Sequence, residues 1–263
     1  MTIRRSTTRR THRREIATTR TLLWKISGTG RTADGRQRAD FIRKTWRCLG
    51  GAGVVMLLLS ILMVLPWRWV APPTSAFMLR EQLFQGNAVH YQWVPWESIS
   101  PHLAIAVVAA EDQKFPIHHG FDFESIAKAL DETRGRRRGA STISQQVAKN
   151  LFLWPGRSYI RKGLEAYFTL LIETCWPKRR ILEIYLNVAE FGPGVFGTGA
   201  ASRHYFAKPA ERLSLWDASL LAAVLPSPKK MSVLRPSPYV RGRAYEIRTW
   251  AYKLGGARYL ADI

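Results

Sequence analysis

The chain has 263 residues, a net charge of +21 and two cysteines. This length allows one medium-sized domain with appendages and excludes two large domains. The cysteines, Cys48 and Cys175, are far apart and do not indicate a disulfide framework, so we interpret both as ordinary apolar residues.

The first block of positive charge is residues 1–47, which hold 14 Lys and Arg against three acidic residues. Thr, Ser and Gly are interspersed and apolar periodicity is almost lacking, so we predict a disordered cytoplasmic tail. A basic tail also suits a membrane-tethered nucleic-acid binder or scaffold. A topology signal that favours anionic lipid explains the same charge, and we predict no nucleic-acid partner.

The most apolar stretch is residues 48–67, a run of 20 residues without a charge between Arg47 and Arg68. As a helix it is about 30 Å long, the thickness of a bilayer core. A signal peptide is the alternative, but the apolar part is longer than an h-region and no small-x-small cleavage site closes it before Pro66. We predict a retained transmembrane helix with a cytoplasmic N-terminus, because Lys and Arg crowd that side.

The remainder, residues 68–263, is predicted to be a mainly α-helical extracytoplasmic domain. Ser100 and Pro101 suit the N-cap and the first position of a helix that continues through the apolar run 103–110. Alternating strand patterns with hairpin signals and internal repeats are not evident.

Three further helices are predicted in this domain. Apolar residues recur at four-residue spacing over 143–151 and again over 160–171, where Pro177 should end the helix. Ser214 with Asp217 resembles a capping box that opens a third apolar helix.

The first polar constellation, at residues 111–120, reads EDQKFPIHHG. Glu111 follows an apolar helix, where burial and the negative end of the helix dipole both raise the pKa of a carboxyl. A raised pKa suits a general base. A solvated helix end with charges in its last turn is the alternative, and these ten residues alone do not decide between the two.

The second constellation, at residues 139–150, reads GASTISQQVAKN. Helical spacing places four polar side chains along one broad side: Thr142, Gln145, Gln146 and Lys149. Amides, hydroxyls and one cation suit sugar hydroxyls and a phosphate. A solvent-facing side is the alternative, although such faces usually carry more Glu and Lys.

The third constellation extends from Arg157 to Glu165, with cations around a single acid. Arg161 and Glu165 are four residues apart, and a surface ion pair is the simpler interpretation in isolation. Arg157 follows Lys149 by about eight residues, and the two together suit a pyrophosphate.

Taken together, the patterns E-D-x-x-F-x-x-H-x-G at 111–120, G-x-S-T-I-x-Q-Q-x-x-K-N at 139–150 and R-K-x-x-E at 161–165 resemble family 51 glycosyltransferases. K-x-x-I-L-E-x-Y-L-N at 178–187 follows in the same order and spacing. The resemblance covers residues 90–230, and although one such motif is weak, their ordered combination is specific.

Within that family the chain resembles the monofunctional biosynthetic members rather than the bifunctional penicillin-binding proteins, because fewer than 80 residues follow Tyr185. Ser227 to Lys230 fits S-x-x-K, but no KTG motif accompanies it and we interpret it as a turn. One departure is Ala207, where family members more often carry Gly.

The resemblance implies a lysozyme-like helical fold and lipid II, with its undecaprenyl pyrophosphate, as the substrate. It implies that Glu111 takes the proton from the acceptor 4-hydroxyl, that Lys149 and Arg157 balance the charge of the leaving group, and that the anomeric carbon is inverted. Glu165 is implied to assist, with a divalent cation, Mg²⁺ or Mn²⁺, as a candidate cofactor. Further implied substrate-binding residues are Asp112, Lys114, Ser141, Thr142, Gln145, Gln146, Asn150, Arg161 and Lys162.

Expected partners are lipid II, the growing glycan strand, the membrane and cell-division or elongation proteins, with the catalytic domain in the periplasm and the anchor in the bacterial inner membrane. Phe121, Phe152 and Trp154 are interpreted as core, or alternatively as surface that dips into lipid. A lytic enzyme that cleaves glycan is the rival function, since a lysozyme-like domain with one catalytic Glu serves it too. Such a hydrolase has no need for Lys149 with Arg157.

Overall fold

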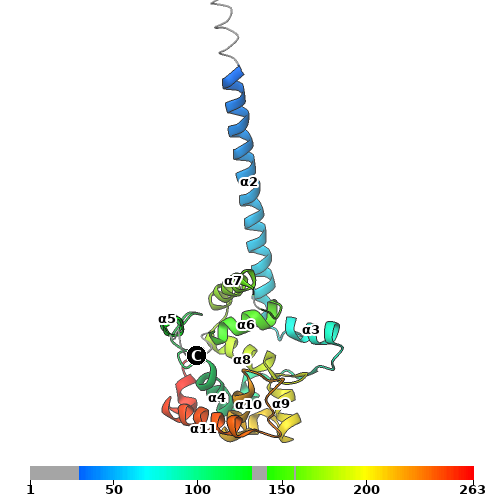
Figure 1. Ribbon diagram of the computed structural model, residues 1–263, viewed down its shortest axis with the longest axis vertical. Helices are drawn as coiled ribbons and strands as arrows, with labels where there is room; N and C mark the ends of the chain where they lie inside the picture. Colours follow the sequence, from blue (N-terminus) through cyan, green and yellow to red (C-terminus); the bar gives the residue numbers. More distant parts are fainter. Residues whose placement is uncertain (1–29, 132–140, 157) are drawn as a thin grey trace, which may run out of the picture. The chain divides into compact units, whose positions relative to one another are not determined.

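The structure is a computed structural model, and it describes residues 30–131, 141–156 and 158–263. The chain divides into two units, Met1–Ser60 and Ile61–Ile263, and the three polar constellations belong to the second. Most of the described residues in that unit are helical (Figure 1).

Most of the apolar run lies in α2, Gly30–Val64, which starts earlier than the sequence predicts. Residues 30–47 are helical, whereas we predicted disorder as far as residue 47; residues 1–29 lie outside the described residues. Extending an existing helix adds one hydrogen bond for each residue fixed, which is why helix continues into the polar flank. The segment Arg38–Arg68 is long and apolar enough to cross a membrane, and few of its residues are buried.

The second unit is mainly α, as predicted. Its described helices are α3 (Ala76–Gln85), α4 (Pro101–Glu111), α5 (Phe123–Asp131), α6 (Ile143–Phe152), α7 (Tyr159–Cys175), α8 (Lys178–Val188), α9 (Gly197–Phe206), α10 (Leu215–Val224) and α11 (Pro238–Lys253). Short 3₁₀ turns lie before, between and after them: η1 (Leu65–Arg68), η2 (Trp96–Ser98), η3 (Ala210–Arg212) and η4 (Gly256–Leu260).

A small three-stranded sheet was not predicted. Its order is β1-β3-β2, with β1 (His90–Tyr91) parallel and β2 (Glu190–Gly192) antiparallel to β3 (Val195–Phe196). Strands of two or three residues are too short to show an alternating pattern, so the sequence carries no signal for them.

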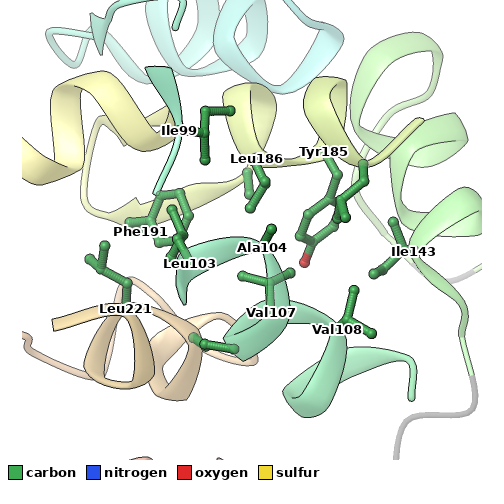
Figure 2. Close-up of a cluster of buried hydrophobic side chains, with 14 of the residues drawn as sticks. Ile99, Leu103, Ala104, Val107, Val108, Ile143, Tyr185, Leu186, Phe191 and Leu221 are labelled. Carbon is green, nitrogen blue, oxygen red and sulfur yellow. The ribbon is translucent and has the colours of Figure 1, made fainter. Parts of the chain in front are cut away.

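The core is centred on α4, which packs against α10 and α11 (Figure 1). Ser100 caps α4 by accepting a hydrogen bond from the backbone N–H of His102, with Pro101 in the first turn, as predicted. Every residue from Leu103 to Ala109 is buried, and Figure 2 shows several of them among side chains of neighbouring helices. A helix that is apolar all round belongs inside a core. It ends at Glu111 and so brings a carboxylate to the edge of that core.

The apolar side of α7 is only partly covered. The helix ends at Cys175 before Pro177, as predicted. Ile160 is 75% exposed and Leu164 36% exposed, so the spacing indicates the helix but not a core partner for its first turns. Trp154 is 50% exposed, so its interpretation as core is wrong.

The motif at 178–187 forms most of α8 and holds an extended segment in place. Asn187 accepts a hydrogen bond from the Val94 N–H and donates one to the Val94 carbonyl, both at 2.8 Å. Glu183 accepts one from the Trp96 N–H at 2.9 Å. The acidic and amide residues of this motif therefore serve the fold.

Candidate active site

Glu111 is the last residue of α4 and is half-buried. Burial raises the pKa of its carboxyl. A hydrogen bond from Gln146 Nε2 to Oε2, at 2.7 Å, and the charges of Arg243 and Lys149 act against this rise, while Asp112 adds to it. Burial is one of the two causes that the sequence predicts for a raised pKa at the end of an apolar helix.

Lys149 lies one turn after Gln146 in α6. Burial lowers the pKa of its ammonium group, the charge of Glu165 counteracts that fall, and Arg161 adds to it. Glu111 also raises the pKa of Lys149, so the acid and the cation are close enough to interact.

The Lys149 ammonium forms no hydrogen bond or ion pair with the residues that the structure describes. It lies over the ring of Phe77, with Nζ 5.7 Å from the centroid. A partly buried cation is costly when, as here among the described residues, no carboxylate lies within ion-pair distance, so this position favours an anion brought by a ligand.

Glu165 is 3% exposed and is held between two cations. Arg161 Nη1 lies 2.6 Å from Oε2, and Lys162 Nζ lies 2.5 Å from Oε1. Arg161 also donates to the Gly156 carbonyl, and Lys162 donates to Ser141 Oγ at 3.3 Å. The simple surface pair is therefore wrong for Arg161 and Glu165, because both side chains are buried within a larger charge cluster.

The family resemblance implies a divalent cation near this charge cluster. Mg²⁺ prefers several oxygen ligands, but both carboxylate oxygens of Glu165 already face cations. Within the described ranges, no group of three or more His, Cys, Asp or Glu residues is placed to hold a metal ion. Among the described residues, Glu165 therefore has no free carboxylate oxygen for Mg²⁺ or Mn²⁺.

Asp112 connects two helices. Its carboxylate accepts a hydrogen bond from His118 Nε2 at 2.9 Å and another from the Ile143 N–H, at the start of α6, at 3.0 Å. The Gly120 N–H donates to His118 Nδ1, so the network assigns the imidazole proton to Nε2. The polar groups of Asp112 therefore fix the end of α4 to the start of α6.

Thr142 and Gln145 form a capping box at the start of α6. Each is 3% exposed, and Thr142 Oγ1 also donates to the Gly120 carbonyl at 2.6 Å. These contacts give the two side chains a role in the fold, and their role in sugar binding stays a prediction. The T-x-x-Q spacing was the signal, since a capping box needs a hydroxyl and an amide three residues apart.

Lys114, Asn150 and Arg157 were also predicted to bind substrate. Lys114 forms ion pairs with Glu124 and Asp122 beside the start of α5, and Glu124 raises the pKa of Lys114. Asn150 is 9% exposed at the end of α6. Arg157 lies outside the described residues, so its predicted role is untested.

Two residues near Glu111 were not predicted from the sequence. Tyr185 of α8 donates its hydroxyl to Gln146 Oε1 at 3.1 Å. Arg243 of α11 donates to the Ala110 carbonyl at 3.2 Å and contributes to the electrostatics of Glu111. Tyr185 stands in a motif and was identifiable in principle, but Arg243 has no local sequence signal.

A comparison with known families covers the part of the chain that holds these residues. A family model described as Transglycosylase matches residues 79–249, which include every residue placed in the site above except Phe77. The chain belongs to the transglycosylase family. In this transglycosylase the matched range lies within the second unit, and α2 precedes it in the chain.

Curated transglycosylases resemble the chain over most of its length. A biosynthetic peptidoglycan transglycosylase of Pseudomonas aeruginosa is 55% identical over 208 residues, which cover 76% of this chain and 90% of the relative. Proteins with the same name from Xylella fastidiosa and Xanthomonas campestris are 52% and 50% identical, over 82% and 83% of this chain and 92% of each relative.

Proposed function

We propose that this transglycosylase polymerises lipid II into β-1,4-linked glycan strands and releases undecaprenyl diphosphate. The names of the curated relatives support the peptidoglycan substrate class. The observation that carries the proposal is that Glu111, a carboxylate with a raised pKa, lies near Lys149, a partly buried cation that forms no ion pair with the described residues.

Glu111 is the general base in this proposal. Gln146 occupies Oε2, and among the described residues no hydrogen bond reaches Oε1, which is available to the acceptor. Oε1 takes the proton from the 4-hydroxyl as the hydroxyl oxygen bonds to the anomeric carbon of the donor. The bond from that carbon to the diphosphate oxygen breaks, and the configuration is inverted. A general base is most effective when its pKa lies near the working pH, and burial moves the pKa of Glu111 in that direction.

The cations of the site receive the departing diphosphate. Lys149 has no competing carboxylate within ion-pair distance among the residues described, whereas Arg161 and Lys162 are held in place by Glu165. Preorganised charges stabilise developing negative charge without reorganising at the moment of reaction. Glu165 acts by positioning two of these cations, and Arg157 joins them in the proposal on the strength of the family resemblance.

The proposed location is the bacterial inner membrane, with the N-terminus cytoplasmic and the catalytic unit periplasmic. The apolar stretch in α2 supports an anchor, and the basic residues before it support this orientation. A polyprenyl substrate stays in the bilayer because its apolar tail is costly to hydrate. An anchored enzyme therefore meets lipid II by lateral diffusion. Cell-division or elongation proteins are the proposed protein partners.

The test is incubation of the full-length chain, solubilised in detergent, with labelled lipid II. We expect glycan polymer and free undecaprenyl diphosphate, and inhibition by a phosphoglycolipid such as moenomycin. A parallel reaction contains preformed glycan strands in place of lipid II. Shortening of those strands without any polymer from lipid II would identify a lytic enzyme and contradict the proposal.

A further inference from the structure

We infer that Tyr185 is a positioning residue for Glu111. By fixing the orientation of the Gln146 amide, it keeps a hydrogen-bond donor against the Glu111 carboxylate. This inference rests on the proposed role of Glu111 as general base. It adds the residue that holds the base in its proton-accepting form.

Three side chains from three helices form the chain of contacts. Tyr185, from α8, is 1% exposed, and its hydroxyl lies 3.1 Å from Gln146 Oε1. Gln146, from α6, donates through Nε2 to Glu111 Oε2, at the end of α4, at 2.7 Å. Because an amide oxygen can only accept, the tyrosine hydroxyl must be the donor in its contact.

The surroundings of Tyr185 favour donation from its hydroxyl to the Gln146 amide oxygen. Figure 2 shows its ring among apolar side chains such as Ala104 and Ile143, with the hydroxyl directed towards α4. Its contact with Gln146 is the hydroxyl's one hydrogen bond among the described residues. If the amide turned over, its NH₂ group would face the tyrosine and the hydroxyl proton would lose its acceptor in an apolar core, which is costly.

Turning the Gln146 amide would also change the group that faces the Glu111 carboxylate. Its oxygen would face Oε2, and two acceptors at that distance are compatible only if Glu111 is protonated and donates. The amide orientation and the protonation of Glu111 are therefore coupled. Tyr185 selects the orientation that matches the ionised carboxylate.

The other charged groups around Glu111 do not replace this contact. Arg243 from α11 and Lys149 from α6 favour the ionised form of Glu111, and the neighbouring Asp112 disfavours it, but none of them orients the amide. Burial raises the pKa of Tyr185 well above its ordinary value, so the hydroxyl remains a donor at every working pH.

The experiment compares Tyr185→Phe with Tyr205→Phe in the full-length chain. Tyr205 is the matched control, because its hydroxyl donates to the Phe191 carbonyl at 3.3 Å and, within the described part of the chain, forms no hydrogen bond with Glu111 or Gln146. We measure kcat and KM for lipid II polymerisation as a function of pH. In Tyr185→Phe we expect the acid limb of kcat to move to higher pH. We expect kcat on that limb to fall about tenfold, the scale of one hydrogen bond to a charged group, with KM nearly unchanged.

A double-mutant cycle separates this role from a merely structural one. In a Gln146→Leu background the amide is gone, so Tyr185→Phe should have no further effect on the acid limb. A loss of kcat that is equal at all pH values, or equal in both backgrounds, would overturn the inference. Gln146→Leu alone leaves the core tyrosine in place and should move the limb at least as far as Tyr185→Phe.

An infrared titration distinguishes failure of this inference from failure of the proposed function. The protonated-carboxyl band of Glu111 is assigned by its disappearance in Glu111→Gln, and its midpoint is read without any turnover. We expect the midpoint to rise in Tyr185→Phe and to stay in place in Tyr205→Phe. An unmoved midpoint rejects the coupling, whereas a wild-type chain that makes no polymer rejects the proposed function alone.

Discussion

At the scale of single residues, burial acts in opposite senses on Glu111 and Lys149. It raises the pKa of the acid and lowers that of the amine, so each group is brought closer to its neutral form. The proposed chemistry needs both in their charged forms. Activity should therefore be lost as pH falls through the pKa of Glu111 and as it rises through the pKa of Lys149.

Variants of Lys149 test the predicted loss of activity at alkaline pH. We expect Lys149→Ala to lower kcat by about 100- to 1,000-fold, the usual cost of removing one preorganised group that stabilises a transition state. Lys149→Arg keeps the charge at all pH values and should move the alkaline limb of the rate profile upward. Initial rates of lipid II polymerisation against pH measure both. An alkaline limb that stays in place in Lys149→Arg would assign that limb to another group.

Gly120 contributes its backbone N–H and carbonyl to the hydrogen bonds of His118 and Thr142. It occupies a left-handed conformation with φ of 87°, and a Cβ there would lie 2.8 Å from Thr169 Cγ2 and 3.0 Å from Glu173 Cγ. We expect Gly120→Ala to lower the free energy of unfolding by about 2–3 kcal/mol, from backbone strain and overpacking. Thermal unfolding in detergent measures this change. The control is Gly163→Ala in α7, where a Cβ meets open space and should stabilise the helix by about 1 kcal/mol. Equal effects of the two substitutions would contradict the account.

At the scale of elements, capping signals were the most reliable part of the sequence. Ser214 and Asp217 form the predicted capping box of α10. The capping box at Thr142 and Gln145 was not predicted, because these residues were interpreted only as part of a substrate-binding side, and helical spacing alone does not identify a cap. The short strands and the exposed first turns of α7 were missed for a different reason: both depend on what packs nearby, which local periodicity does not encode.

Ala207, where family members more often carry Gly, lies at a strained backbone position. It ends α9 in a left-handed conformation, with φ of 52°, where glycine avoids the steric penalty of a Cβ. We expect Ala207→Gly to raise the free energy of unfolding by about 1 kcal/mol without changing the rate of polymerisation. Ala200→Gly, inside the same helix, should lower it by about the same amount. Thermal unfolding of both variants checks the prediction, and destabilisation by Ala207→Gly would contradict it.

At the scale of the whole molecule, the site joins residues that are distant in sequence. Ordered motifs made much of it predictable, and the structure brings together Glu111, Ser141, Gln146, Lys149, Arg161, Lys162 and Glu165. Arg243 is 133 positions from the carbonyl that it binds, and no motif marks it. Contacts of this kind depend on how α11 packs against α4, which only the folded chain shows.

The central claim is that a carboxylate at the edge of the core activates a sugar hydroxyl while the cations beside it receive a diphosphate. Its most direct test is polymerisation of lipid II by the full-length Glu111→Gln variant, alongside the wild type and Glu97→Gln. Glu97 is an exposed glutamate paired with Arg179, outside the site. We predict that Glu111→Gln binds lipid II and makes no polymer above background, while Glu97→Gln matches the wild type. Polymer from Glu111→Gln at the wild-type rate would contradict the account.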